Sequence, residues 1–345
     1  MFATTIETNS IPSLQYLLSN QLTPEDLQQE VEYLIPNFLV ANSLNVFFAK
    51  AGQGKSFLML SLALTLIRSK KIEQCLYIDM DNSKSALKNR GVDNFIVQHP
   101  ELVYVHSSKF TDSPRTLLDK LSFDTKQNIE KDIFKGTLFI FDSIRDFIDG
   151  DMNSDRDIIK LMQKLKDLRE AGGTVIYLHH TTKISDGVQF KGSTSFIDSV
   201  DVAYSLSSTR NLNKLTYQLT VHKDRLSVED CAFELDTQTM ILESENLQIA
   251  SMSENEASFA KEVQAFLKFY PEGIKQSELL TNVGKSSDDK TARKYLHKFA
   301  NELWKLEKRP KEKNASFYFP IEQIALPIDK PNPPILPIID DDIPF

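Results

Sequence analysis

The sequence predicts an α/β fold, in which a mostly parallel sheet carries helices on both faces and is followed by a smaller domain. Apolar runs of strand length alternate with segments of helical period, which is the order of a parallel sheet. Several runs are apolar at every position, as expected of strands that are covered on both sides. A Gly/Lys/Ser turn also separates the first such run from a helical pattern, and this layout is typical of α/β nucleotide-binding folds.

Composition sets the broad class. The chain has 345 residues, of which 41% are hydrophobic and 26% charged, and this suits one large domain with a small one. No apolar run approaches the roughly 20 residues that span a bilayer, and no signal-peptide pattern opens the chain, so we expect a cytoplasmic protein. Cys75 and Cys231 are too few for a disulfide framework or a zinc site. The net charge of −8 excludes a uniformly basic coat but not a local basic surface.

The pattern divides the chain into five parts. The large domain should contain strands at 44–48, 76–78, 102–105, 138–141 and 174–178, with helices such as 57–67 and 158–168 between them. From about Asp201, adjacent strands at 202–206, 215–221 and 232–235 predict an antiparallel sheet edge. The predicted boundaries are an N-terminal helical segment 1–30, the α/β domain 31–245, a linker 246–255, a winged helix-turn-helix domain 256–320 and a flexible tail 321–345.

The turn after the first strand predicts a P-loop. Backbone N–H groups and a helix N-terminus would surround the phosphates of ATP, with Lys55 reaching the β- and γ-phosphates and the Ser56 hydroxyl binding Mg²⁺. Ala49 occupies the position of the first Gly of this motif, and an Ala forced to positive φ costs about 1 kcal/mol. The alternative is a Gly-containing turn before an ordinary helix. The candidate ATP-binding residues are Ala49, Lys50, Ala51, Gly52, Gln53, Gly54, Lys55, Ser56 and Phe57.

Polar residues follow three further strands, at the edge where the P-loop lies. Asp142 ends a buried strand and is placed to hold the water shell of Mg²⁺. Asp81 is the candidate for orienting the attacking water, with Asp79 as the second choice; alternatively both cap the next helix. His179 and His180 end another strand. Two histidines with no third ligand make a poor metal site, so His180 is predicted to be a polar sensor of the γ-phosphate.

Residues 31–245 resemble the ATPase core of the RecA superfamily, in particular the RepA-like branch of hexameric plasmid helicases and their DnaB-like relatives. The resemblance rests on the P-loop and on segments 141–147, 151–155, 178–183 and 191–195. It implies a RecA-like fold with ATP and Mg²⁺ as ligands. It also implies that Asp142 is the Walker B carboxylate, that Asp81 replaces the usual catalytic Glu, and that His180 fills the sensor position.

The same resemblance implies an oligomer. Lys223 and Arg225 correspond to a Lys-x-Arg pair that reaches the nucleotide of a neighbouring subunit, which implies a homo-oligomeric, hexameric ring or a filament. The alternative is a solvated basic strand end. By analogy alone, Lys183 and Lys191 in the loop after the histidines would touch DNA, expected to be single-stranded, in a central channel.

A basic segment follows near the C-terminal end. Between residues 290 and 313, nine Lys and Arg residues stand against three Glu residues, in a chain that is acidic overall. The spacing predicts a recognition helix followed by a basic turn that contacts phosphates. A solvated face or a partner-docking surface is the alternative. The DNA-binding candidates in this segment are Lys290, Arg293, Lys294, Lys298, Lys308, Arg309 and Lys311.

The last six residues are identical to the C-terminal tip of enterobacterial single-stranded DNA-binding protein. They are Asp340, Asp341, Asp342, Ile343, Pro344 and Phe345. The resemblance implies host partner proteins that recognise this tip: the Phe345 ring would enter an apolar pocket while the acidic run steers the peptide onto a basic rim. A second possible use is occupation of the protein's own basic channel.

These resemblances together imply an ATP-hydrolysing, DNA-binding oligomer of replication, recombination or repair, in the setting of a bacterium, phage, plasmid or mobile element. One alternative is a helicase loader or recombination mediator without unwinding activity. Another is a non-catalytic adaptor in which nucleotide only stabilises the oligomer.

Overall fold

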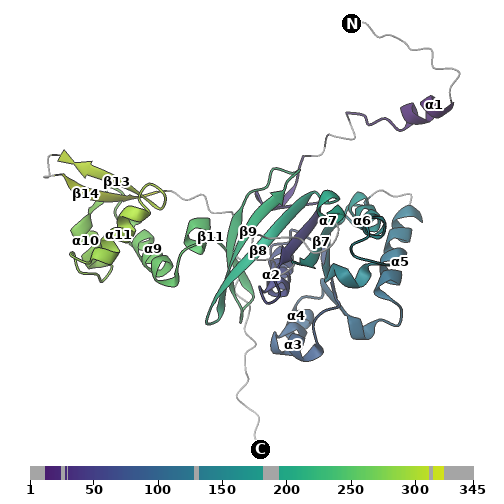
Figure 1. The fold of residues 1–345 in the computed structure, drawn as a ribbon, viewed down its shortest axis with the longest axis horizontal. Coiled ribbons are helices and arrows are strands. Elements are labelled where there is room, and N and C mark those ends of the chain that lie inside the picture. The colour runs from purple at the N-terminus through teal and green to yellow at the C-terminus, as the bar shows by residue number, and fades with distance from the viewer. Residues whose placement is uncertain are drawn as a thin grey trace, which may run out of the picture. The chain divides into compact units, whose positions relative to one another are not determined.

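The computed structural model describes residues 12–24, 28, 30–127, 132–181, 194–310 and 314–321 (Figure 1). The chain divides into two compact units, Met1–Glu32 and Tyr33–Phe345. The first contains α1 (Pro12–Ser19), and the second contains all other elements described below. Within the described ranges, no helix is both long and apolar enough to cross a membrane.

A nine-stranded sheet organises the second unit. Its strand order is β11-β10-β9-β8-β3-β7-β6-β4-β5. Neighbours from β8 to β5 are parallel, whereas β9, β10 and β11 add an antiparallel edge. The predicted α/β class with a mostly parallel sheet is therefore confirmed. The strands are β3 (Leu44–Ala49), β4 (Gln74–Asp79), β5 (Leu102–His106), β6 (Thr137–Asp142), β7 (Thr174–His180), β8 (Val202–Asn211), β9 (Lys214–Lys223), β10 (Cys231–Asp236) and β11 (Ile241–Glu245).

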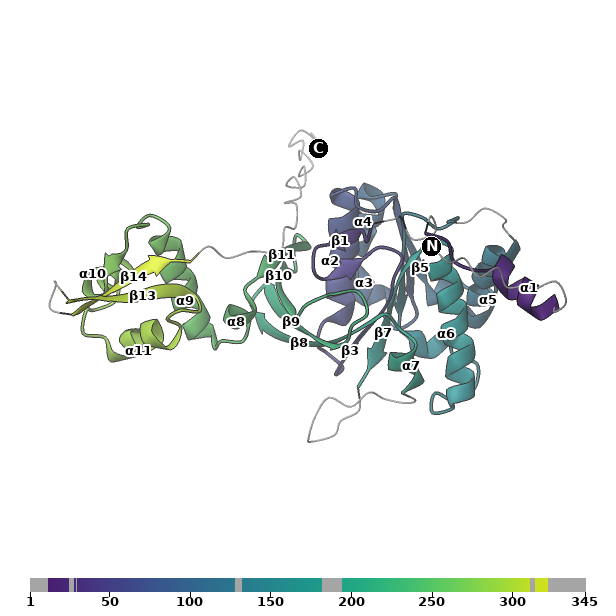
Figure 2. The ribbon, with the colours of Figure 1, turned by 90° about the horizontal axis from the view of Figure 1, so that it is seen from above.

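Helices cover both faces of this sheet, as Figure 2 shows. Side chains of β3 alternate between the two cores: Phe47 packs in one and Phe48 in the other. Burying each such side chain contributes about 1.5–3 kcal/mol. The first core includes α2 (Lys55–Arg68), α3 (Lys84–Asn89), α4 (Val92–Gln98) and the ribbon of β1 (Tyr33–Ile35) and β2 (Leu39–Val40). The second includes α5 (Pro114–Gln127), η3 (Ile144–Phe147), α6 (Asp155–Glu170) and α7 (Ser195–Asp198); η2 (Ser107–Lys109) follows β5.

The register of the parallel strands brings their carboxyl ends to one edge. Ala49 of β3 pairs with His180 of β7, and Asp79 of β4 pairs with Asp142 of β6. Because β7 lies between β3 and β6, His180 stands between the P-loop and Asp142. The topology thus gathers side chains that are far apart in the sequence.

The C-terminal part has its own core and a three-stranded sheet in the order β12-β14-β13. The side chains of Ser253 and Glu256 form a capping box at the start of its first long helix. The elements are α8 (Leu247–Ala250), α9 (Glu254–Leu267), β12 (Ile274–Lys275), α10 (Gln276–Asn282), α11 (Lys290–Lys298), β13 (Trp304–Arg309) and β14 (Ala315–Pro320). The segment 246–255, predicted to be a linker, therefore holds α8 and the start of α9.

The short strands β1, β2 and β12, of two or three residues each, were not predicted from the sequence. The longer β11 and β13 were also missed, because their polar residues obscure the two-residue alternation of a strand. β13 occupies most of the predicted basic turn; its Trp304 and Leu306 face the core while Lys305 between them is exposed. β11 is an edge strand in which Leu242 alone is buried, and the three residues after Leu242 are polar. In both strands, the exposed positions carry the charges that favoured a turn or a linker.

Candidate active site

The loop between β3 and α2 is fixed in shape by two positive-φ glycines and by contacts with the antiparallel edge of the sheet. Gly52 has φ of 82° and Gly54 has φ of 73°. A Cβ on Gly54 would lie 2.7 Å from the Tyr217 hydroxyl oxygen, and that hydroxyl donates to the Gly54 carbonyl at 2.9 Å. The Ser208 N–H donates to Gln53 Oε1 at 2.7 Å, and the Ser208 hydroxyl donates to the Gln53 carbonyl at 3.0 Å. The loop is therefore held open as a cradle by β8 and β9.

Ala49 carries no backbone strain. It is the last residue of β3, it is buried, and its φ is not positive. Its carbonyl accepts the Thr181 N–H at 3.2 Å, so the strand pairing continues to this position. The expected cost of an Ala in place of the first Gly is therefore wrong, because the turn begins only after this residue.

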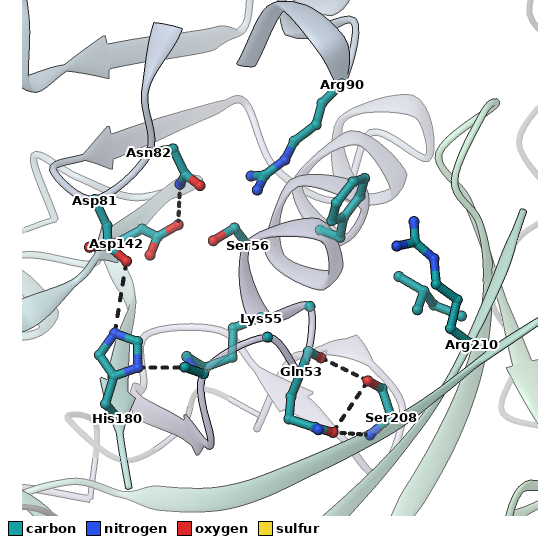
Figure 3. A pocket seen from close by; sticks show the side chains of 15 residues that line it. Gln53, Lys55, Ser56, Asp81, Asn82, Arg90, Asp142, His180, Ser208 and Arg210 are labelled. Carbon is teal, nitrogen blue, oxygen red and sulfur yellow. Dashed lines mark hydrogen bonds and ion pairs between the residues drawn. The ribbon is translucent and has the colours of Figure 1, made fainter. Parts of the chain in front are cut away.

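Lys55 opens α2 and is nearly buried at the floor of a cavity of about 370 Å³ (Figure 3). Its amino group donates to the Ala49 carbonyl at 3.2 Å and lies 3.4 Å from His180 Nδ1. Burial lowers the pKa of Lys55, and the nearby Asp142 and Asp81 carboxylates oppose this shift. The other lining residues are Ala51, Gly52, Gln53, Gly54, Ser56, Phe57, Asp81, Asn82, Arg90, Asp142, His180, Ser208, Arg210 and Leu215. Of the predicted ATP-binding residues, Ala49 and Lys50 do not line this cavity.

Asp142 is buried at the end of β6 beside this loop. The Tyr77 hydroxyl donates to its Oδ2 at 3.0 Å, and Asn82 Nδ2 lies 3.4 Å from the same oxygen. Burial raises the pKa of Asp142 to about 6; a hydrogen bond from Ser56 opposes this, and the Asp79 charge adds to it. Ionising a carboxylate in this buried place is costly, so a bound cation would stabilise its charged form.

The residues present fit a Mg²⁺ ion. Ser56 and Asp142, the predicted pair, both line the cavity and supply only oxygen ligands, which this ion prefers. Across the described residues, no group of three or more His, Cys, Asp or Glu side chains could hold a metal. Mg²⁺ usually binds through one or two protein oxygens together with water and substrate phosphates, and Ser56 and Asp142 offer two such oxygens.

Asp79 and Asp81 have different surroundings. Asp79 is fully buried and accepts hydrogen bonds from the N–H groups of Asp81 and Asn82 and from the Tyr104 hydroxyl. The Asp81 side chain is 44% exposed and lines the cavity, with its Oδ2 3.8 Å from His180 Nε2. The side chain that caps α3 is that of Ser83. Asp79 therefore shapes the turn, and Asp81 faces the space where a substrate would react.

The two histidines point to opposite sides of β7. His180 lies between Lys55 and Asp81, with one ring nitrogen toward each (Figure 3). His179 is buried, and its ring lies 4.6 Å from that of Phe196 in an edge-on arrangement. Neighbouring positions of a strand face opposite ways, which explains why the pair does not act together.

Two arginines at the cavity were not identified from the sequence. Arg90, just after α3, lies over the Phe57 ring with 4.7 Å between its guanidinium carbon and the ring centre. Arg210 enters the cavity from β8, and Figure 3 shows the two on different sides of it. Neither lies in a recognisable motif, so only the folded topology could reveal them.

The predicted trans-acting residues lie away from this cavity. The Lys223 amino group donates to the carbonyls of Ile197 and Asp198, at 2.9 and 2.6 Å, and so caps the end of α7 in its own chain. Burial lowers the pKa of Lys223, as does the neighbouring Arg225. Arg225 is exposed.

The predicted DNA-binding residues fall into three groups. Lys290, Lys294 and Lys308 are exposed. Arg293 and Lys298 form ion pairs with Asp288 and Glu256, at 2.9 and 2.6 Å, and Arg309 lies over the Phe317 ring. Outside the described residues are Lys183, Lys191, Lys311 and the tip formed by Asp340, Asp341, Asp342, Ile343, Pro344 and Phe345.

A comparison with protein families agrees with this geometry. A family model described as "AAA domain" matches residues 17–186, a range that includes the P-loop, Asp81, Asp142 and His180. No curated protein sequence matches. Among solved structures, the chain is similar to the flagellar accessory protein FlaH from Methanocaldococcus jannaschii, with 17% sequence identity and a TM-score of 0.41 over 60% of this chain and 90% of that one. The family match and the site together support a P-loop ATPase.

Proposed function

We propose that this protein hydrolyses MgATP and couples the reaction to a change in its grip on DNA. One observation carries the proposal: a single cavity brings together a phosphate cradle, a buried lysine, a carboxylate suited to Mg²⁺ and a half-exposed carboxylate. Phosphoryl transfer needs mainly positioning and charge stabilisation, and these groups supply both.

Each side chain then has a distinct role. Lys55, whose amino group is held by weak contacts at 3.2 Å and beyond, would exchange them for the β- and γ-phosphates of ATP. Ser56 and Asp142 would hold Mg²⁺, which neutralises phosphate charge when it is bound. Asp81 would orient the attacking water and accept its proton. His180, in contact with both Lys55 and Asp81, would sense the γ-phosphate.

DNA binding is assigned to two places. We interpret the helices and the three-stranded sheet of the C-terminal part as a winged helix, in which α11 would contact a duplex through Lys290 and Lys294. Lys183 and Lys191, which follow β7 in the sequence, would contact DNA in a ring. Lys223 and Arg225 would complete the nucleotide site of a neighbouring subunit, and Lys223 would have to release α7 to do so.

The C-terminal tip is proposed to recruit host proteins that recognise the end of single-stranded DNA-binding protein. Deleting residues 343–345 should abolish the capture of such proteins in pull-downs and leave the rate of ATP hydrolysis unchanged. Equal capture with and without these three residues would contradict recruitment.

The central test is the rate of ATP hydrolysis with single-stranded DNA, with duplex DNA and without DNA. Lys55→Ala should lower the rate at least about 100-fold, because the charge that holds the transferring phosphate is lost. Lys109→Ala removes an exposed lysine of η2 and is the matched control. Wild-type turnover in Lys55→Ala would refute the proposal. If the protein binds ATP without hydrolysing it, with or without DNA, the non-catalytic adaptor is favoured. A strand-displacement assay distinguishes a helicase from a helicase loader.

A further inference from the structure

Among the described residues, the three-stranded sheet of the C-terminal part has helices on one face and none on the other. Figure 1 shows α9, α10 and α11 gathered on one side of β13 and β14. Trp304 and Tyr318 are fully buried on that side, in the core of this part. Because successive side chains of a strand point to opposite faces, Phe317 and Phe319 lie on the other face. We call this second face the outer face.

Cations lie against both aromatic rings of the outer face. The guanidinium carbon of Arg309 is 4.1 Å from the centre of the Phe317 ring and 5.6 Å from that of Phe319. The Lys305 amino group is 5.9 Å from the Phe319 ring centre, in register with it across the sheet. Phe317 is only 8% exposed, whereas Phe319 is partly open to solvent.

The backbone at Gly273 packs closely against the Phe319 ring. A Cβ on Gly273 would come within 2.4 Å of that ring, so this position has room for no side chain. Arg309 donates from its Nη2 to the Glu272 carbonyl at 3.1 Å, which fixes the guanidinium by its edge. The turn that ends in Gly273 begins beside Phe269, whose side chain is 79% exposed.

The outer face is positive in a chain whose net charge is −8. Lys275 pairs with Phe317 across β12 and β14, so three cations, Lys275, Lys305 and Arg309, surround the two rings. Glu307 opposes them and forms an ion pair with Lys305 at 2.6 Å. Aromatic rings interleaved with cations on a sheet are the combination that unpaired bases and their phosphates require.

We propose that the outer face binds single-stranded nucleic acid. Unpaired bases stack on the Phe319 ring, and the positive charges of Lys275, Lys305 and Arg309 attract the phosphates. This assignment rests on the proposed function, in which nucleic acid is the partner. It adds a contact surface on the sheet to the one already proposed on α11. A duplex hides the flat faces of its bases, so it cannot use the outer face in this way.

The test is the affinity of the full chain for a fluorescein-labelled oligo-dT strand and for a hairpin duplex, measured by anisotropy at low salt. Phe319→Leu keeps an apolar side chain but removes the ring, and it should weaken oligo-dT binding about tenfold, the scale of one lost base stack. Phe319→Tyr keeps the ring and should bind as the wild type does. Phe123→Leu, at an aromatic that is 59% exposed on α5, is the matched control and should leave binding unchanged.

The single tryptophan provides the folding control. Trp304 is fully buried on the helix-covered side, with its indole N–H donating to the Leu296 carbonyl, so its fluorescence should be unaltered in Phe319→Leu. Wild-type oligo-dT affinity in a folded Phe319→Leu would overturn the proposal. An equal loss of duplex binding in Phe319→Leu would also overturn it, as would a wild-type protein that does not bind oligo-dT. Oligo-dT binding through Phe319 in a chain that hydrolyses no ATP would refute the proposed function but leave this site standing.

Discussion

The edge of the large sheet and the basic C-terminal part place their charged groups in opposite ways. At the sheet edge, Lys55, Asp79 and Asp142 are buried, and the two carboxylates accept hydrogen bonds from groups of the fold. In the C-terminal part, the charges lie at the surface and many are engaged by a near neighbour, as Lys298 is by Glu256. A charge that the fold buries at such an edge is a strong functional candidate, since burial without a purpose is costly.

The contrast has a consequence for how each region responds to substitution. Charge changes at the sheet edge alter either chemistry or stability, depending on how many internal bonds the side chain accepts. Charge changes on the C-terminal surface alter only the interaction with a charged ligand, because exposed ion pairs contribute little to folding, about 0–1 kcal/mol. Two sets of variants test this difference, beginning with the larger effect.

The largest effect should separate the two carboxylates beside β4. Asp81→Asn removes the group that faces the cavity and should lower the ATP turnover number about 100-fold with unchanged ATP affinity and melting temperature. Asp79→Asn weakens a buried acceptor of backbone N–H groups and should lower the free energy of unfolding by about 1–3 kcal/mol. Steady-state ATPase rates and thermal melts of both variants provide the measurements.

The opposite result for the two carboxylates would contradict the roles given to Asp79 and Asp81. A stable Asp79→Asn protein without turnover, beside an active Asp81→Asn protein, would mean that exposure in the cavity does not mark the catalytic carboxylate. Asp81→Glu sharpens the test, because it extends the carboxylate by one methylene toward the reacting water. We expect it to keep turnover within about tenfold of the wild type.

Much of the sheet edge could be predicted from the sequence. Strands that are buried on both faces are apolar throughout, so β3, β6 and β7 stand out, and the residues after them share one edge because parallel strands must end together. The sequence could only rank Asp81 above Asp79, because the conformation of the turn decides which carboxylate is buried and which faces the cavity. Arg90 and Arg210 could not be found, because no local pattern shows that their elements meet at the cavity.

The C-terminal part was harder to predict for the opposite reason. Its helices follow from apolar spacing, but the charge pattern of β13 favours a turn, and only the pairing with β14 shows that Lys305 and Arg309 share the outer face with the two Phe rings. Counting basic residues also overstates the free positive charge. The count includes Arg293 and Lys298, and it cannot show that each contacts a carboxylate nearby.

The smallest effect should therefore come from substitutions in α11. The change in duplex binding and its salt dependence should be larger for exposed lysines than for a lysine in an ion pair. Replacing both Lys290 and Lys294 by Ala should weaken duplex binding about fivefold and reduce the slope of log affinity against log salt by about two, one for each lost phosphate contact. Lys298→Ala should change that slope by less than one half, because this lysine already neutralises Glu256 and releases no counterion from DNA. Anisotropy titrations of a hairpin duplex at several salt concentrations give the slopes. Equal slopes for the double variant and the wild type would show that α11 does not face the duplex, and an equally large change in Lys298→Ala would show that its ion pair opens on binding.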